Sequence, residues 1–197
     1  RELEREARLL ARLSHPVLVR GFGAVLDGRF PHLVLEHLEG PTLAALLRRD
    51  GALALEQLLP LALHIASALH YLAAEGVVHL DVKPGNIVMG APPRLIDLSV
   101  ARTLEQAAAL RTPIGTDAFM APEQRAPDGR IGPATDVFGL AATLRASLPR
   151  RPPGALTEVV EAGLDPDPAN RPTAAEFARR LEPTVAALPS RMTLGRA

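Results

Sequence analysis

The chain has 197 residues, of which 47% are apolar, and this is typical of one globular domain with a hydrophobic core of its own. Its 22 Lys and Arg residues balance 22 Asp and Glu residues, which argues against bulk electrostatic binding to nucleic acid or to anionic membranes. No cysteine is present, which excludes disulfides, thiolate catalysis and cysteine-based metal sites.

The first part of the chain is predicted to form a helix and a hairpin. Apolar residues from Leu3 to Leu13 recur at helical spacing, and Pro16 ends the pattern. Asp27-Gly28 lies between two β-prone runs, which predicts a tight hairpin turn. A short helix is then expected from Thr42 to Arg49, with Thr42 as its N-cap.

A long amphipathic helix is predicted from Leu55 to about Glu75, where Gly76 ends it. Polar residues and a proline interrupt its apolar run, so no stretch of about 18 apolar residues exists and no membrane segment is expected in this chain. The chain begins at Arg1 and shows no signal-peptide pattern. With no cysteine present, we expect a cytoplasmic location.

The second part of the chain is predicted to be mostly helical. Two short apolar runs, at 87–89 and 95–96, flank "GAPP" and predict another hairpin. A polar loop is expected to continue to Pro122. Helices are predicted near 134–147, 155–164 and 173–181.

The stretch "HLDVKPGN", His79 to Asn86, contains the only lysine of the chain, Lys83. Its Pro-Gly pair keeps the stretch out of a helix, so its polar residues lie on a loop between a long helix and a short strand. Asp81 can accept a proton from a hydroxyl nucleophile, and the Asn86 carbonyl is an oxygen ligand suited to Mg²⁺. A compact lysine charge fits against a transferring phosphoryl group where the broad fork of arginine would not.

Four further motifs follow the "HLDVKPGN" loop along the chain. "LIDLSVAR" places Asp97 directly after an apolar strand, where its carboxylate and Asn86 could hold a metal on a nucleotide. The next pieces are "GTDAFMAPE" from Gly115, "ATDVFGL" from Ala134 and "DPDPANRPT" from Asp165.

In this order and spacing the motifs resemble a eukaryotic-type (Hanks-type) serine/threonine protein kinase, most closely the bacterial members. The resemblance runs from Arg1 to about Leu181. It implies an α+β, protein-kinase-like fold with a truncated N-lobe at 1–36, made of the family's C-helix and its fourth and fifth strands. It further implies a mostly helical C-lobe at 37–188 with a shortened G-helix region, a C-terminal tail at 189–197, ATP and Mg²⁺ as cofactors, and a protein substrate.

The resemblance also assigns roles around the loop. Asp81 matches the catalytic base, Lys83 the phosphate-facing lysine, and Thr116 the threonine that lines the substrate hydroxyl site. Asn86 and Asp97 match the metal ligands.

Weaker patterns imply the nucleotide site. Glu6 matches the C-helix glutamate that pairs with a strand lysine, although glutamates on helices are usually solvated. The hinge and the floor of the adenine pocket are implied at Leu35, Glu36, Leu38, Val88 and Ile96. The backbone at Glu36 and Leu38 would face adenine.

Four other residues match structural positions of the family. Glu123 and Arg171 match a buried ion pair, and Asp136 matches the aspartate that braces the catalytic loop. We expect His79 to be a packed core histidine and not an acid.

The sequence departs from the family at several places. Lys83 is already placed, so the strand lysine is not in this chain, and "GFGAV" at Gly21–Val25 lacks the third glycine of a phosphate-binding loop. We therefore expect a chain cut just before the C-helix, with weak or no activity of its own. Leu80 replaces an arginine that answers activation-loop phosphate, which argues against strict control by such a phosphate. Ser99 replaces a hinge glycine, and the short "PRRPPG" stretch replaces a helix used for docking.

The leading hypothesis is a protein serine/threonine kinase. The alternative is a pseudokinase or regulatory scaffold. The missing front part, Leu80, Ser99 and the shortened G-helix region favour it, whereas the intact Asp81, Lys83, Asn86 and Asp97 oppose it. A small-molecule phosphotransferase of the aminoglycoside or choline kinase type shares an H-x-D…N loop but lacks the "KP" and "GT…APE" features. No nucleic-acid partner is expected, and further domains outside this chain are anticipated.

Overall fold

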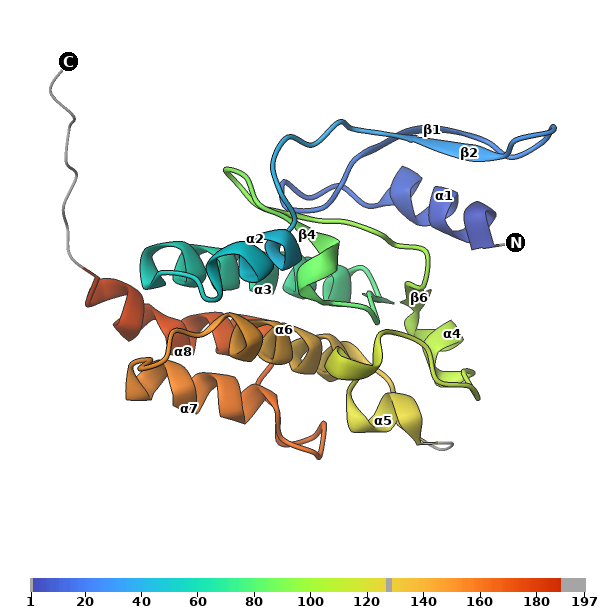
Figure 1. Ribbon diagram of the computed structural model, residues 1–197. Helices are drawn as coiled ribbons and strands as arrows, with labels where there is room; N and C mark the ends of the chain where they lie inside the picture. Colours follow the sequence, from blue (N-terminus) through green and yellow to red (C-terminus); the bar gives the residue numbers. More distant parts are fainter. Residues whose placement is uncertain (1, 127–128, 189–197) are drawn as a thin grey trace, which may run out of the picture.

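The computed structural model describes residues 2–126 and 129–188, so the predicted tail at 189–197 lies outside the described residues. The first part forms helix α1 (Glu2–Arg12) and an antiparallel hairpin of β1 (Gly21–Val25) and β2 (His32–Leu35), which lies along that helix (Figure 1). The predicted hairpin is confirmed, but its turn is not tight. Residues 26–31 connect the strands, with Gly28 at a φ of 112° that favours glycine.

The rest of the described chain is mostly helical, with two further pairs of very short strands, β3 with β6 and β4 with β5. Its helices and strands are α2 (Leu43–Asp50), α3 (Leu55–Ala74), β3 (Val77–Val78), η1 (Pro84–Asn86), β4 (Ile87–Val88), β5 (Arg94–Leu95), β6 (Arg102–Thr103), α4 (Leu104–Ala108), η2 (Asp117–Phe119), α5 (Pro122–Arg125), α6 (Pro133–Ser147), α7 (Gly154–Gly163) and α8 (Ala174–Ala186). The predicted boundaries at 1–36 and 37–188 stay predictions.

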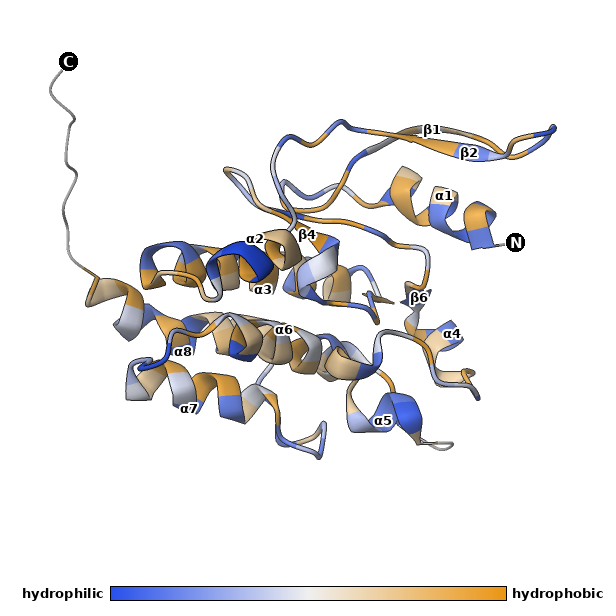
Figure 2. Ribbon diagram, viewed as in Figure 1, coloured by the Kyte–Doolittle hydropathy of each residue, from blue (hydrophilic) through white to orange (hydrophobic). Residues whose placement is uncertain are grey.

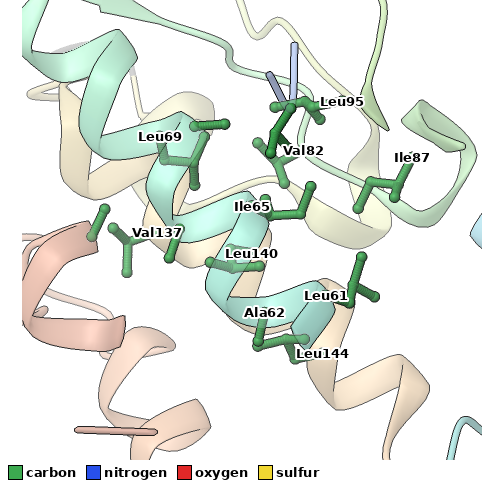
Figure 3. Close-up of a cluster of buried hydrophobic side chains, with 14 of the residues drawn as sticks. Leu61, Ala62, Ile65, Leu69, Val82, Ile87, Leu95, Val137, Leu140 and Leu144 are labelled. Carbon is green, nitrogen blue, oxygen red and sulfur yellow. The ribbon is translucent and has the colours of Figure 1, made fainter. Parts of the chain in front are cut away.

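Helix α3 is the centre of the helical part and packs against α6 and α8. Figure 3 shows Ile65 and Leu69 of α3 in one buried cluster with Val137 and Leu140 of α6. By length and composition alone α3 could cross a membrane, yet half of the qualifying window is buried inside the fold. Core packing therefore accounts for its apolar character.

Helix α6 also supports the loop between β3 and β4. A Cβ atom at Gly139 would lie 3.0 Å from both Cβ and the carbonyl oxygen of Val82, so the helix and the loop are in close contact there. Asp136 lies one turn earlier on the same helix. The loop that carries the predicted catalytic residues is thus held against the rigid core of the molecule.

Several local predictions are confirmed. Thr42 caps α2 by accepting a hydrogen bond from the Ala45 amide at 3.2 Å, and the second hairpin exists as the β4–β5 pair. The stretch between Ser147 and Gly154 contains no helix, in agreement with the predicted shortening of the G-helix region.

The prediction of a polar loop up to Pro122 is wrong in part. The segment contains helix α4 and strand β6, which pairs with β3, and helix α5 begins at Pro122 itself. The N-terminus of α4 carries a capping box. Thr103 accepts a hydrogen bond from the Gln106 amide, and the Gln106 side chain accepts one from the Thr103 amide.

Hydrophobic residues lie along β1 and β2, at the edge of the molecule (Figure 2). Phe22 is 64% exposed and Phe30 is 72% exposed, far more than is usual for such large apolar side chains. The hairpin thus rests one face on α1 and presents apolar side chains on its other surfaces.

Candidate active site

The loop from His79 to Lys83 is fixed by a buried carboxylate. Asp136 Oδ2 accepts a hydrogen bond from the His79 amide at 2.7 Å, and its Oδ1 accepts one from the Leu80 amide at 2.8 Å. Leu80 has a φ of 69°, in the left-handed region that a leucine rarely adopts. Such a conformation persists only where the surroundings hold it, and Asp136 supplies part of that support.

Three predicted catalytic residues converge at the end of this loop. Thr116 Oγ1 donates to Asp81 Oδ1 at 2.7 Å, and Lys83 Nζ lies 2.7 Å from Asp81 Oδ2. Lys83 Nζ also donates to Thr116 Oγ1 at 2.6 Å. Asp81 is buried, whereas the Lys83 side chain is 24% exposed. The structure thus places a carboxylate, an ammonium group and a hydroxyl in mutual contact beside solvent.

The two predicted metal ligands lie at the ends of neighbouring strands. Asn86 precedes β4 and Asp97 follows β5. The backbone amide of Ile96 donates to the backbone carbonyl of Asn86 at 2.9 Å. The Asn86 amide nitrogen donates to the backbone oxygen and to Oδ2 of Asp81, both at 2.9 Å. The side-chain nitrogen of Asn86 is thus engaged with Asp81, and the side-chain oxygen is the atom that could bind a metal ion.

The donor set around Asn86 and Asp97 fits Mg²⁺. Asp97 Oδ1 accepts from the Ser99 amide and hydroxyl, and Asp97 has a φ of 69° that turns the chain at the strand end. Among the described residues, no three His, Cys, Asp or Glu side chains are grouped to hold a metal ion. An amide oxygen and one carboxylate suit a magnesium ion that takes its other ligands from phosphates and water.

Helix α1 brings Glu6 and Arg5 to the Asp97–Ser99 segment. The Arg5 guanidinium donates to the Ser99 carbonyl at 2.7 Å. Burial, and next the negative charge of Asp97, raises the pKa of the Glu6 carboxyl. The role of Glu6 as the C-helix glutamate stays a prediction, and the lysine expected to pair with it is not in this chain, since Lys83 is the only lysine.

The predicted hinge residues begin at Leu35, the last residue of β2, and continue to Leu38. The Glu36 amide donates to the Arg20 carbonyl at 2.9 Å, and its carboxylate accepts from the Arg20 amide at 2.7 Å. Leu38 and Ile96 pack partly buried against the core, Val88 is buried, and Leu35 is exposed. Their roles in binding adenine stay predictions.

His79 is buried and neutral, as expected of a packed histidine. Burial lowers the pKa of its imidazole, against the opposing effect of Asp81. The Asp81 amide donates to Nδ1 at 3.3 Å, so the proton is on Nε2, which contacts the Ile96 carbonyl at 3.2 Å. The ring links the catalytic-type loop to the strand that carries Asp97.

Glu123 and Arg171 form the predicted buried ion pair. Two parallel contacts of 2.7 and 2.8 Å join the guanidinium to the carboxylate, and Thr135 donates to the same carboxylate at 2.9 Å. The Arg171 guanidinium also lies 4.9 Å from the ring centroid of Phe138. This arrangement ties α5, at the end of the segment carrying Thr116, to α6 and to the loop before α8.

Two residues near the site were missed by the sequence analysis. Gln124 is 4% exposed, and its amide donates to the carbonyls of Leu80 and Ile114. Gly115 has a φ of 123°, and a Cβ atom there would lie 2.7 Å from the Leu80 carbonyl oxygen. The position of Gly115 directly before Thr116 in the "GTDAFMAPE" motif could have indicated a role for the glycine. No local sequence pattern indicates a role for the glutamine.

Asp136 gives a prediction for pH dependence. Burial raises its pKa to about 7 from 3.8, against the hydrogen bonds from His79 and Leu80. A pKa that is higher in the folded state adds stability below pH ~4, and that contribution is lost as the pH rises to about 7. We expect the difference in free energy of unfolding between the wild type and Asp136→Asn to shift against the wild type by at most about 4 kcal/mol over this range.

Urea unfolding followed by circular dichroism at several pH values measures this difference. A difference that stays constant from pH 4 to 7 would contradict the prediction. It would mean that the two amide donors keep Asp136 ionised despite its burial.

Comparisons with known proteins agree on one family. A family model described as "Protein kinase domain" matches residues 1–162. The serine/threonine-protein kinase PkaA of Streptomyces coelicolor is 35% identical over 175 residues, which cover 83% of this chain and 32% of the relative. PknB of Mycobacterium leprae is 30% identical over 158 residues, covering 76% and 25%, and PknA of Mycobacterium tuberculosis is 33% identical over 176 residues, covering 83% and 41%. The chain thus spans between about a quarter and two fifths of the length of these relatives.

Proposed function

Since this chain belongs to the protein kinase family, we propose that the protein is a serine/threonine protein kinase that transfers the γ-phosphate of ATP to serine and threonine hydroxyls of proteins. The observation that carries the proposal is the contact of Thr116 with Asp81 and Lys83, which lie on the loop that also presents Asn86. The names of the bacterial relatives support the same reaction and the same class of substrate.

In the proposed reaction Asp81 orients the attacking hydroxyl and accepts its proton. The substrate oxygen forms a bond to the γ-phosphorus, the bond from that phosphorus to the bridging oxygen breaks, and ADP leaves. Lys83 lies beside Asp81 and would offset the negative charge that develops on the transferred group. Thr116 donates to Asp81, and its hydroxyl marks where a substrate hydroxyl would bind.

Mg²⁺ would neutralise charge on the phosphates of ATP. The Asn86 side-chain oxygen and the Asp97 carboxylate would hold it, as their donor chemistry fits. ATP and a protein substrate as ligands, and a cytoplasmic location for this domain, are parts of the same proposal. The expectation of further domains outside this chain stays a prediction.

A non-catalytic scaffold is the second candidate, and one contact favours it. The Ser99 hydroxyl donates to Asp97 Oδ1 at 2.5 Å, and the amide of the same residue donates to the same oxygen. A metal ion at Asp97 would have to compete with two donors at that oxygen.

Transfer of labelled γ-phosphate by the natural full-length protein separates these candidates. With Mg²⁺-ATP and a mixed Ser, Thr and Tyr peptide substrate, we expect phosphoserine and phosphothreonine and no phosphotyrosine. ATP binding without transfer to protein or to small alcohols would favour the scaffold, whereas transfer to an aminoglycoside or choline alone would contradict a protein substrate.

The 197-residue chain itself gives a related expectation. Because no lysine is present to pair with Glu6, we expect isothermal titration calorimetry to show ATP binding weaker than micromolar. Micromolar binding by this chain would contradict our view of the residues that hold the phosphates.

A further inference from the structure

The buried side chain of Gln124 connects three segments around the active site. Its Nε2 donates to the Leu80 carbonyl at 3.0 Å and to the Ile114 carbonyl at 2.7 Å. Its Oε1 accepts from the Ala121 amide at 2.9 Å. Both amide protons and the carbonyl are therefore used, and the side chain has no freedom to serve another partner.

The bond to Leu80 acts on the residue directly before Asp81. Leu80 is in the left-handed region, and its two peptide groups are held from opposite sides, the amide by Asp136 and the carbonyl by Gln124. Removing one of the two supports would let Leu80 relax toward an ordinary backbone conformation. Because Asp81 is the next residue, its carboxylate would move with that change.

The bond to Ile114 acts on the residue that precedes Gly115 and Thr116. Gly115 lies so close to the loop that a Cβ atom would be 2.7 Å from the Leu80 carbonyl oxygen and 3.1 Å from Gln124 Nε2. Thr116 then donates to Asp81 at 2.7 Å. One amide group thus holds both backbones that meet in the Thr116–Asp81 hydrogen bond.

We propose that Gln124 is a positioning residue that keeps Asp81 and Thr116 in register for phosphoryl transfer. This inference rests on the proposed function. The link is a set of neutral hydrogen bonds, so it forms without a phosphate on the segment from Asp97 to Glu123. It explains how that segment can be ordered although Leu80 stands where the resemblance places a phosphate-binding arginine.

The test compares three variants of the natural full-length protein. Gln124→Leu keeps the approximate volume and removes all three hydrogen bonds. Gln106→Leu makes the same change at a glutamine whose side chain hydrogen-bonds only to Thr103 among the described residues. Phe177→Leu loosens the core at a fully buried position of α8, away from the site.

We expect Gln124→Leu to lower kcat by about 10- to 100-fold, because a misplacement of about 1 Å at a reacting group has an effect of that order. The KM for ATP should change by less than about twofold, since Gln124 contacts no residue assigned to the nucleotide. Gln106→Leu and Phe177→Leu should keep kcat within about threefold of the wild type at a temperature well below unfolding.

Hydrogen–deuterium exchange gives a second readout that does not depend on activity. In Gln124→Leu we expect faster exchange at 79–82 and 112–120 and unchanged exchange along α3. A wild-type protein without transferase activity would overturn the proposed function, and exchange alone would then decide the role of Gln124. The positioning role would be overturned if Gln124→Leu kept the kcat of the wild type and showed unchanged exchange. It would also be overturned if exchange in Gln124→Leu became faster equally over α3, α6 and α8.

Discussion

Replacing Asp81 by asparagine is expected to lower the turnover of the full-length protein by about 10²- to 10⁴-fold, the range found for a group that takes a proton in the transition state. Asparagine keeps the shape of the side chain and can still accept from Thr116, so the loop should stay folded. It cannot accept the substrate proton, and its amide would face donors on Lys83 and Asn86. The affinity for ATP should change little, because the loss is confined to the chemical step.

The matched control for this change is Asp117→Asn, at an exposed aspartate of η2 whose side chain makes no hydrogen bond within the described residues. It should retain turnover within about threefold of the wild type. Single-turnover kinetics with a saturating peptide measures the chemical step directly. Near-normal rates in Asp81→Asn would show that another group takes the proton.

Replacing Arg171 by methionine is expected to lower the free energy of unfolding by about 3–5 kcal/mol, because Glu123 would remain buried as an unpaired charge. The side chains of Arg171 and Glu123 are 0% and 5% exposed, so water cannot replace the lost partner. Replacing both residues by methionine should recover most of the loss, since no charge then stays buried. Chemical denaturation in urea measures the free energy of unfolding of the wild type, of Arg171→Met and of the double variant.

The exposed pair Arg49–Asp50 provides the contrast. Its contact distance is also 2.7 Å, but its side chains are 70% and 44% exposed. Arg49→Met should therefore change the free energy of unfolding very little. If Arg171→Met cost no more than Arg49→Met, the Glu123–Arg171 pair would not be the structural link that its burial indicates.

The sequence was sufficient for the long elements because their pattern is local. The apolar face of α3 and the capping threonine of α2 are properties of short windows, and both were predicted. The β3–β6 pair was not, because each strand is only two residues long and its partner is distant in the sequence. Helix α4 was missed although its Thr103–Gln106 capping box was visible.

The site divides in the same way. Asp81, Lys83 and Asn86 lie within one motif, so their proximity could be predicted, and Thr116 followed from the resemblance. Gln124 could not be predicted, because its role depends on where the Leu80 and Ile114 carbonyls lie in space. The left-handed backbone of Leu80 also left no mark in the sequence, since leucine is a poor residue for that conformation.

The single lysine has a consequence for covalent chemistry. Reactions aimed at side-chain amines, such as acetylation or the attachment of a protein tag, have one target among these 197 residues, and arginine offers them no alternative. That amine lies 2.7 Å from Asp81 and is only partly exposed. Among the side chains of these 197 residues, an acylating reagent would therefore modify only the amine beside Asp81, and the adduct would remove the positive charge of Lys83.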